Sequence, residues 1–165
     1  MSKPFFSEIF GSFPETDIID GSIVENCHLD IETRSMDVTL SCDVYVGLSV
    51  QRQINDYIKN ALQLEKCRIG FLFPESAFCT DASKDIAEEI RLKNAPLNGY
   101  LNGADYILDG DSLKINLKHG GYKKIIDCGF QNAFISRVKE LFGRTITIEF
   151  EGQLEDEEFV LPKAE

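Results

Sequence analysis

The chain has 165 residues, of which 43% are hydrophobic, and its formal net charge is −11. This composition is typical of a folded globular protein and argues against disorder. The acidic balance argues against a general binder of duplex DNA, because affinity for phosphates comes mostly from Lys and Arg. There is no apolar run of about 18 residues, so no membrane contact is expected. The start Met1–Glu8 is unlike a secretory signal, and we expect a cytoplasmic protein.

Residues 1–21 are expected to form a short helix and a polar connector. Phe5, Phe6 and Phe10 stand at near-helical spacing, and Gly11 ends the pattern. A helix this short is not stable alone in water. Two interpretations stay open: the helix packs on its own domain, or Phe5, Phe6 and Phe10 anchor a partner.

Residues 22–78 are expected to form a first α+β module. Apolar and polar residues alternate over 36–44, which is typical of a strand with one buried face. A less regular strand over 23–33 precedes it. An amphipathic helix is predicted over 49–64 and a further strand over 66–73. The predicted order is strand, strand, helix, strand.

Residues 79–94 are predicted to form a linking helix, and residues 95–151 a second α+β module. Asp109-Gly110 accepts the conformation that a tight hairpin needs, and the strand after it alternates over 113–117. A helix with apolar positions over 130–142 and a closing strand follow. The order is again strand, strand, helix, strand, which is compatible with structural repeats. The predicted fold is therefore α+β, with two small modules joined by a helix.

Metal and cofactor chemistry has little support in the sequence. The five cysteines are widely spaced and form no Cys-x-x-Cys pair, so we expect small buried or half-buried residues. Asp105, Asp109 and Asp111 surround the predicted hairpin turn, but their spacing does not fit a calcium loop, and Asp is favoured in turns. The acidic residues 152–165 are predicted to form a solvated linker. We expect no metal and no cofactor.

The best candidate for nucleic acid is the stretch around Gly120-Gly121. Glycine at the mouth of a helix lets a phosphate approach backbone N–H groups, and lysines add charge. KH-type modules use a Gly-x-x-Gly loop in this way, but Gly121-Tyr122-Lys123-Lys124 lacks the second Gly. The alternative is a helix start with a solvated lysine face. The candidate contact residues are Lys118, His119, Gly120, Gly121, Lys123 and Lys124.

An evident catalytic set is missing from the sequence. No nucleophile elbow, Walker loop or dinucleotide fingerprint occurs. One hypothesis of another class is a small enzyme that uses His119 and the Asp turn in a cleft. No nucleophile–base pair can be named for it.

Three stretches together resemble one family. They are Pro-Leu-Asn-Gly-Tyr-Leu at 96–101, Asp-Ser-Leu-Lys-Ile-Asn-Leu-Lys-His-Gly-Gly at 111–121, and Lys-Glu-Leu-Phe-Gly at 139–143 before an alternating strand. The combination is similar to the N-terminal region of PolC-type DNA polymerase III, the replicative polymerase of low-GC Gram-positive bacteria. The resemblance covers roughly residues 20–152.

The resemblance implies that this chain is a non-catalytic region of a DNA-directed DNA polymerase with 3′–5′ exonuclease. The catalytic domains of such a protein lie downstream, and their motifs are absent here. The resemblance also implies that residues 95–151 are similar to small KH-like folds that hold replisome proteins, such as the clamp-loader tau subunit. A second hypothesis is weak binding of single-stranded DNA through Lys118, Lys123 and Lys124.

Overall fold

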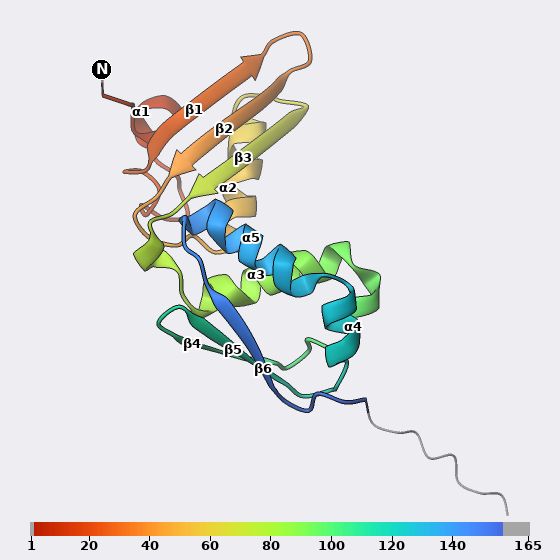
Figure 1. The fold of residues 1–165 in the computed structure, drawn as a ribbon. Coiled ribbons are helices and arrows are strands. Elements are labelled where there is room, and N and C mark those ends of the chain that lie inside the picture. Colours follow the sequence, from red (N-terminus) through yellow and green to blue (C-terminus); the bar gives the residue numbers. More distant parts are fainter. Residues whose placement is uncertain (1, 157–165) are drawn as a thin grey trace, which may run out of the picture. The chain divides into compact units, whose positions relative to one another are not determined.

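The computed structural model describes residues 2–156 of the chain. The chain divides into two compact units: unit 1 is Met1–Ala82 with Glu140–Arg144, and unit 2 is Ser83–Lys139 with Thr145–Glu165. Each unit contains one three-stranded sheet (Figure 1). The α+β fold with two small modules is therefore confirmed. None of the helices within residues 2–156 has both the length and the apolar character that a membrane crossing requires.

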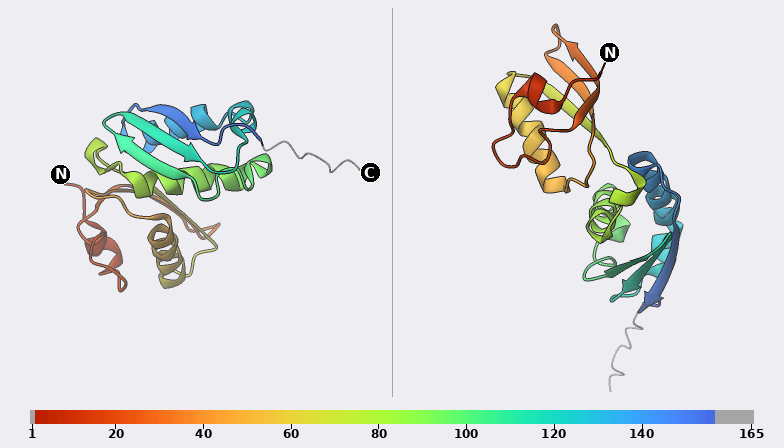
Figure 2. Two further views of the ribbon diagram at one scale, coloured as in Figure 1. Left: turned by 90° about the horizontal axis from the view of Figure 1, so that it is seen from below. Right: turned by 90° about the vertical axis from the view of Figure 1, so that its left-hand side faces the viewer.

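Unit 1 has the predicted order of strand, strand, helix, strand. Strand β1 is antiparallel to β2, and β2 is parallel to β3. The left view of Figure 2 shows α1 and α2 on one side of these strands. The face toward α2 carries the buried apolar residues of β2, and the other face carries its polar residues together with exposed Ile23 and Leu72. The elements are α1 (Phe6–Phe10), β1 (Ile23–Asp30), β2 (Ser35–Ser41), α2 (Leu48–Ala61), β3 (Lys66–Leu72) and the 3-10 turn η1 (Glu75–Ala77).

The core of unit 1 follows the alternation seen in the sequence. Met36, Val38 and Leu40 of β2 are buried, as are Ile54 and Ile58 of α2. An amphipathic helix covers such a sheet face because burial removes both apolar surfaces from water, which contributes about 25 cal/mol per Å².

The N-terminal segment packs on unit 1. Phe6 is fully buried, and its backbone N–H donates to the Ser22 carbonyl at 2.7 Å. The prediction of a partner anchor is therefore wrong for Phe6, whose ring is used by the protein's own core. Phe10 is half-buried, and Phe5 stays 48% exposed.

Unit 2 repeats the sheet topology of unit 1. Strand β4 is antiparallel to β5, and β5 is parallel to β6. The hairpin turns at Gly110 and Asp111, where Gly110 has φ +59°. The linking helix is confirmed as α3. The remaining elements are α3 (Thr80–Lys93), the 3-10 turn η2 (Ala95–Leu97), β4 (Asp105–Asp109), β5 (Ser112–Leu117), α4 (Tyr122–Asp127), α5 (Phe130–Phe142) and β6 (Thr147–Gly152).

The helix predicted over 130–142 is α5, and the structure adds a short helix before it. Helix α4 ends at Asp127 and α5 begins at Phe130, so two helices lie between β5 and β6. Gly129 lies between the helices with φ +73°, a conformation that ends a right-handed helix. Its N–H donates to the Ile126 carbonyl at 2.9 Å, which closes the last turn of α4.

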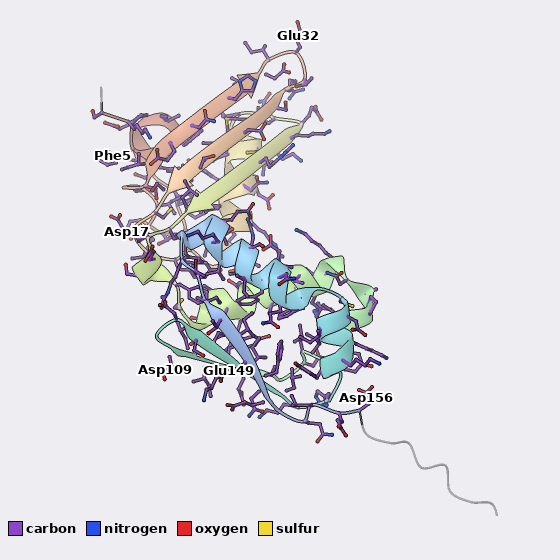
Figure 3. The ribbon with its side chains drawn as sticks, viewed as in Figure 1. Phe5, Asp17, Glu32, Asp109, Glu149 and Asp156 are labelled. Atoms are coloured by element: carbon purple, nitrogen blue, oxygen red, sulfur yellow. The ribbon has the colours of Figure 1, made fainter. Side chains whose placement is uncertain are left out.

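The buried face of β5 holds the core of unit 2. Leu113, Ile115 and Leu117 are buried there. Phe150 of β6 lies opposite Ile115 and contacts the Phe130 ring, with 6.3 Å between ring centroids. The other face of this sheet carries charged residues, among them Asp109 and Glu149, which Figure 3 labels.

Candidate functional site

The candidate contact residues lie together in residues 118–124, which we call the glycine loop. It comprises the connection 118–121 between β5 and α4 and the first turn of α4, which carries Lys123 and Lys124. Gly120 and Gly121 are buried in it, whereas Lys118, Lys123 and Lys124 are exposed. The two glycines have φ of +72° and +83°, the left-handed region that residues with a Cβ rarely adopt.

Gly121 leaves room for an aromatic ring. A Cβ added at Gly121 would stand 2.0 Å from Cδ1 of Tyr100. The Tyr100 ring therefore packs directly on the Gly121 backbone, and any side chain there would displace it. Tyr100 belongs to the 96–101 stretch that resembles the polymerase family, so two of the three stretches meet in this contact.

Residues 153–156 cover the glycine loop from the other side. The N–H of Gly120 donates to the Gln153 carbonyl and the N–H of Tyr122 to the Leu154 carbonyl, both at 3.1 Å. A Cβ at Gly120 would stand 2.6 Å from the Glu155 carbonyl oxygen. Backbone N–H groups that a bound phosphate would use are thus occupied by the chain itself, and the neighbouring residues Glu155 and Asp156 are acidic.

Two of the three candidate lysines have partners inside unit 2. Lys118 forms an ion pair with Asp105 at 2.8 Å, and this hydrogen bond lowers the pKa of Asp105. Lys124 donates to the Tyr100 hydroxyl at 2.8 Å and lies 5.1 Å from the centre of that ring. The hydrogen bond raises the pKa of Lys124. The loop therefore presents less free positive charge than its sequence indicates.

The residues of the enzyme hypothesis lie at two places on unit 2. His119 follows the end of β5, whereas Asp109 and Asp111 lie at the hairpin turn before its start. Six residues of strand separate them, which corresponds to about 20 Å. His119 and these two carboxylates therefore do not share a cleft. Asp105 lies at the other end of the hairpin and pairs with Lys118, the residue before His119. Within residues 2–156, no group of three or more His, Cys, Asp or Glu side chains is placed to hold a metal ion.

Apolar residues gather on the outside of the N-terminal helix. Phe5 is 48% and Ile9 46% exposed, and one helical turn separates them. We call Phe5, Ile9 and Phe10 the N-terminal patch. Two hydrogen bonds hold the backbone of this patch in place. The Phe5 N–H donates to the Glu8 carboxylate at 2.8 Å, and the Tyr57 hydroxyl donates to the Phe10 carbonyl at 3.2 Å.

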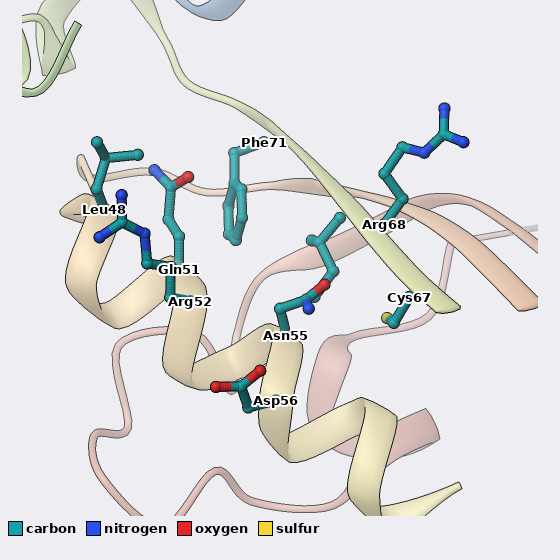
Figure 4. A pocket seen from close by; sticks show the side chains of 9 residues that line it. Leu48, Gln51, Arg52, Asn55, Asp56, Cys67, Arg68 and Phe71 are labelled. Atoms are coloured by element: carbon teal, nitrogen blue, oxygen red, sulfur yellow. The ribbon is translucent and has the colours of Figure 1, made fainter. Parts of the chain in front are cut away.

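A groove in unit 1 was missed by the sequence reasoning. It lies between α2 and the edge strand β3 and has a volume of about 430 Å³ (Figure 4). Phe71 of the strand points toward the helix, where Gln51 and Asn55 line the groove, and Ile69 lines it as well. No signal in the sequence could find it, because helix and strand come together only in the fold. Cys67 lines it, but burial raises the pKa of this thiol, so it is not an activated nucleophile.

Similar proteins do not add to this description. No known protein family matches the sequence, and no curated protein matches it.

Proposed function

We propose that this chain is the non-catalytic N-terminal region of a PolC-type DNA polymerase III and that it docks replisome proteins, such as the clamp-loader tau subunit, during DNA replication. The observation that carries the proposal is the combination of three stretches, 96–101, 111–121 and 139–143, which resembles that region. The downstream polymerase and exonuclease chemistry belongs to the parent protein that the resemblance implies.

The roles of the motif residues support a non-catalytic region. Leu97 and Leu101 are buried, the Tyr100 ring packs on Gly121, and Leu113 lies in the core. The stretches 96–101 and 111–121 thus contribute to the packing of unit 2, whereas Glu140–Arg144, which includes most of the third stretch, belongs to unit 1. A catalytic motif would instead present ionisable groups in a cleft with shifted pKa values.

The N-terminal patch supports docking of a protein. An aromatic and an aliphatic side chain held on a fixed helix are the kind of anchor that fills a pocket on a partner. Phe5 and Ile9 are exposed on the surface of unit 1, whereas the ring of Phe6 is buried and holds the helix on that unit. We therefore place the proposed contact at Phe5, Ile9 and Phe10.

Single-stranded DNA binding is the weaker alternative. Exposed Lys118, Lys123 and Lys124 favour it, but Asp105 pairs with the first of them and the glycine loop is covered by residues 153–156. If this alternative holds, charge reversal at the three lysines abolishes binding, and the loss is largest at low salt.

The proposal is tested by binding and by activity. The tau C-terminal segment from the same organism is titrated into the wild-type chain, into the variant Phe5→Ser with Ile9→Ser, and into Leu92→Ser. Leu92 is 60% exposed on α3 and is the matched control. We expect the double variant to bind at least about tenfold more weakly, a change of about 1.4 kcal/mol, and the control to bind normally. Equal binding by all three would contradict the patch. DNA synthesis or degradation by the purified chain would contradict a non-catalytic role.

A further inference from the structure

The open edge of the sheet in unit 1 is a second candidate interaction surface, and the inference drawn from it does not depend on the proposed function. The strand order places β1 at that edge. The N-terminal segment covers only its start, where the Val24 N–H donates to the Pro4 carbonyl at 2.9 Å and Phe5 bridges Ile23. Residues 26–30 pair with β2 on one side, and no other strand within residues 2–156 pairs with their outer side.

This stretch has little of the usual protection of an edge strand beyond the charge of Asp30 and the bulge between Val24 and Asn26 at its start. Exposed edges normally carry Lys or Pro, which discourage pairing with another chain. Residues 26–31 read Asn-Cys-His-Leu-Asp-Ile and contain neither. Cys27 is exposed, Leu29 is 50% exposed, and Ile31, one residue past the strand, is 81% exposed. Figure 3 shows the free end of this hairpin at the label Glu32.

The polar residues between these apolar ones are a hydrogen-bond donor, His28, and a carboxylate, Asp30. His28 and Asp30 alternate with Cys27 and Leu29, so they lie on the other face of the strand. We propose that the chain self-associates through antiparallel pairing of β1 with β1 of a second copy, centred on Leu29. In this register Leu29 faces Leu29, Cys27 faces Ile31, and His28 faces Asp30 of the second copy.

Side-chain complementarity selects this register, because the imidazole N–H of His28 can donate to the Asp30 carboxylate of the second copy. Centring the pair on Asp30 would set two carboxylates against each other, and centring it on His28 would leave each imidazole without a carboxylate opposite it. Like charges directly opposite destabilise a strand pair, whereas opposite charges and apolar pairs stabilise it. The bulge between Val24 and Asn26 ends the regular stretch on the other side. Since only a few residues per chain take part, the association is weak and depends on concentration.

The first test is sedimentation of the 165-residue chain from about 1 µM to about 1 mM, a range that covers weak association. We expect a reversible monomer–dimer equilibrium. Leu29→Lys sets two cations on the symmetry axis and should raise the dissociation constant at least about tenfold. Leu92→Lys, an equally exposed position on α3, should leave it unchanged. A chain that stays monomeric throughout, or a Leu29→Lys variant that associates like wild type, overturns the proposal.

Substitutions at position 28 distinguish this register from a general effect of introducing lysine into the strand. His28→Lys should associate as well as wild type or better, because the ammonium faces Asp30 of the second copy, and within its own chain the position lies opposite Asp37. His28→Asp should associate more weakly. In an Asp30→Asn background, which keeps a side-chain acceptor for the Glu32 N–H, this difference should shrink. A His28→Lys variant that is as weak as Leu29→Lys overturns the register.

A cross-link tests the register covalently. Ile31→Cys places a thiol opposite Cys27 of the second copy, within the distance that a disulfide spans. Mild oxidation should give a covalent dimer of this variant, and Cys27→Ser in the same variant should abolish it. Cross-linking that survives Cys27→Ser, or no cross-link at a concentration where dimer is present, overturns the pairing. The amide NMR spectrum of each variant reports whether it is folded, so an unfolded variant is not counted.

Discussion

Gly121→Ala is the sharpest perturbation of the glycine loop. The added methyl would stand 2.0 Å from Cδ1 of Tyr100, and Gly121 has φ +83°. Two costs follow. An L-residue in the left-handed region costs about 1–2 kcal/mol, and overpacking a filled site costs about 1–3 kcal/mol. We expect unit 2 to lose about 2–5 kcal/mol of unfolding free energy, the sum of the two.

Gly129→Ala is the matched control. Gly129 has φ +73°, and a Cβ there would meet no heavy atom within 4 Å. This variant should show the backbone cost alone, about 1–2 kcal/mol. The overpacking cost should therefore separate the two variants in a thermal melt, at about 4–8 °C per kcal/mol for a domain of 60–100 residues.

Tyr100→Ala decides whether the ring is responsible. In that background the extra loss caused by Gly121→Ala should disappear, because the atom that the methyl meets is gone. The assay is chemical denaturation followed by amide exchange within unit 2. The reasoning is refuted if Gly121→Ala destabilises no more than Gly129→Ala, or if Tyr100→Ala fails to relieve the difference.

Three further predictions concern single residues. Phe6→Ala should cost about 3–5 kcal/mol in a denaturation experiment because the ring is fully buried, whereas Phe5→Ala should change stability little. Burial raises the pKa of Tyr106 from 10.0 to about 12. Because the pKa of this hydroxyl is higher in the folded state, the stability that Tyr106 contributes is full below pH 10.0 and is lost as the pH rises toward about 12. An ultraviolet titration should therefore show one late tyrosine that Tyr106→Phe removes. A thiol reagent should label exposed Cys27 in the folded chain and spare buried Cys42.

The sheets could be predicted from the sequence because their signals are local. The alternation of Leu113, Ile115 and Leu117 depends only on neighbours in the chain, and so does the turn signal at Asp109-Gly110. Helix α4 was not predicted as an element of its own. Its six residues span less than two helical turns, too short for an apolar periodicity to identify a helix.

The site could be predicted only as a list of residues. The glycine pair and its lysines do lie in one loop, but its covering residues come from distant parts of the chain. Tyr100 precedes the sheet, and Gln153 and Leu154 follow the last strand, in a stretch read as a solvated linker. Nothing in local periodicity links these segments. The same holds for the burial of Phe6, since the sequence left open which face of a short apolar helix meets the core.

The domain boundaries expected at 22–78, 79–94 and 95–151 stay predictions. The two compact units divide within α3, between Ala82 and Ser83, and unit 1 also includes Glu140–Arg144 from the end of α5. The predicted linker 152–165 is described only to Asp156, and its remaining residues lie outside the described part of the chain.

The most direct test of the docking proposal is the heat of binding between this chain and the tau C-terminal segment, with single-stranded DNA titrated in parallel. The proposal predicts saturable heat with tau and none with DNA, because two lysines of the glycine loop have partners and the N–H groups of Gly120 and Tyr122 are occupied. Saturable binding of DNA with no response to tau would contradict it and would make the lysine face the functional surface.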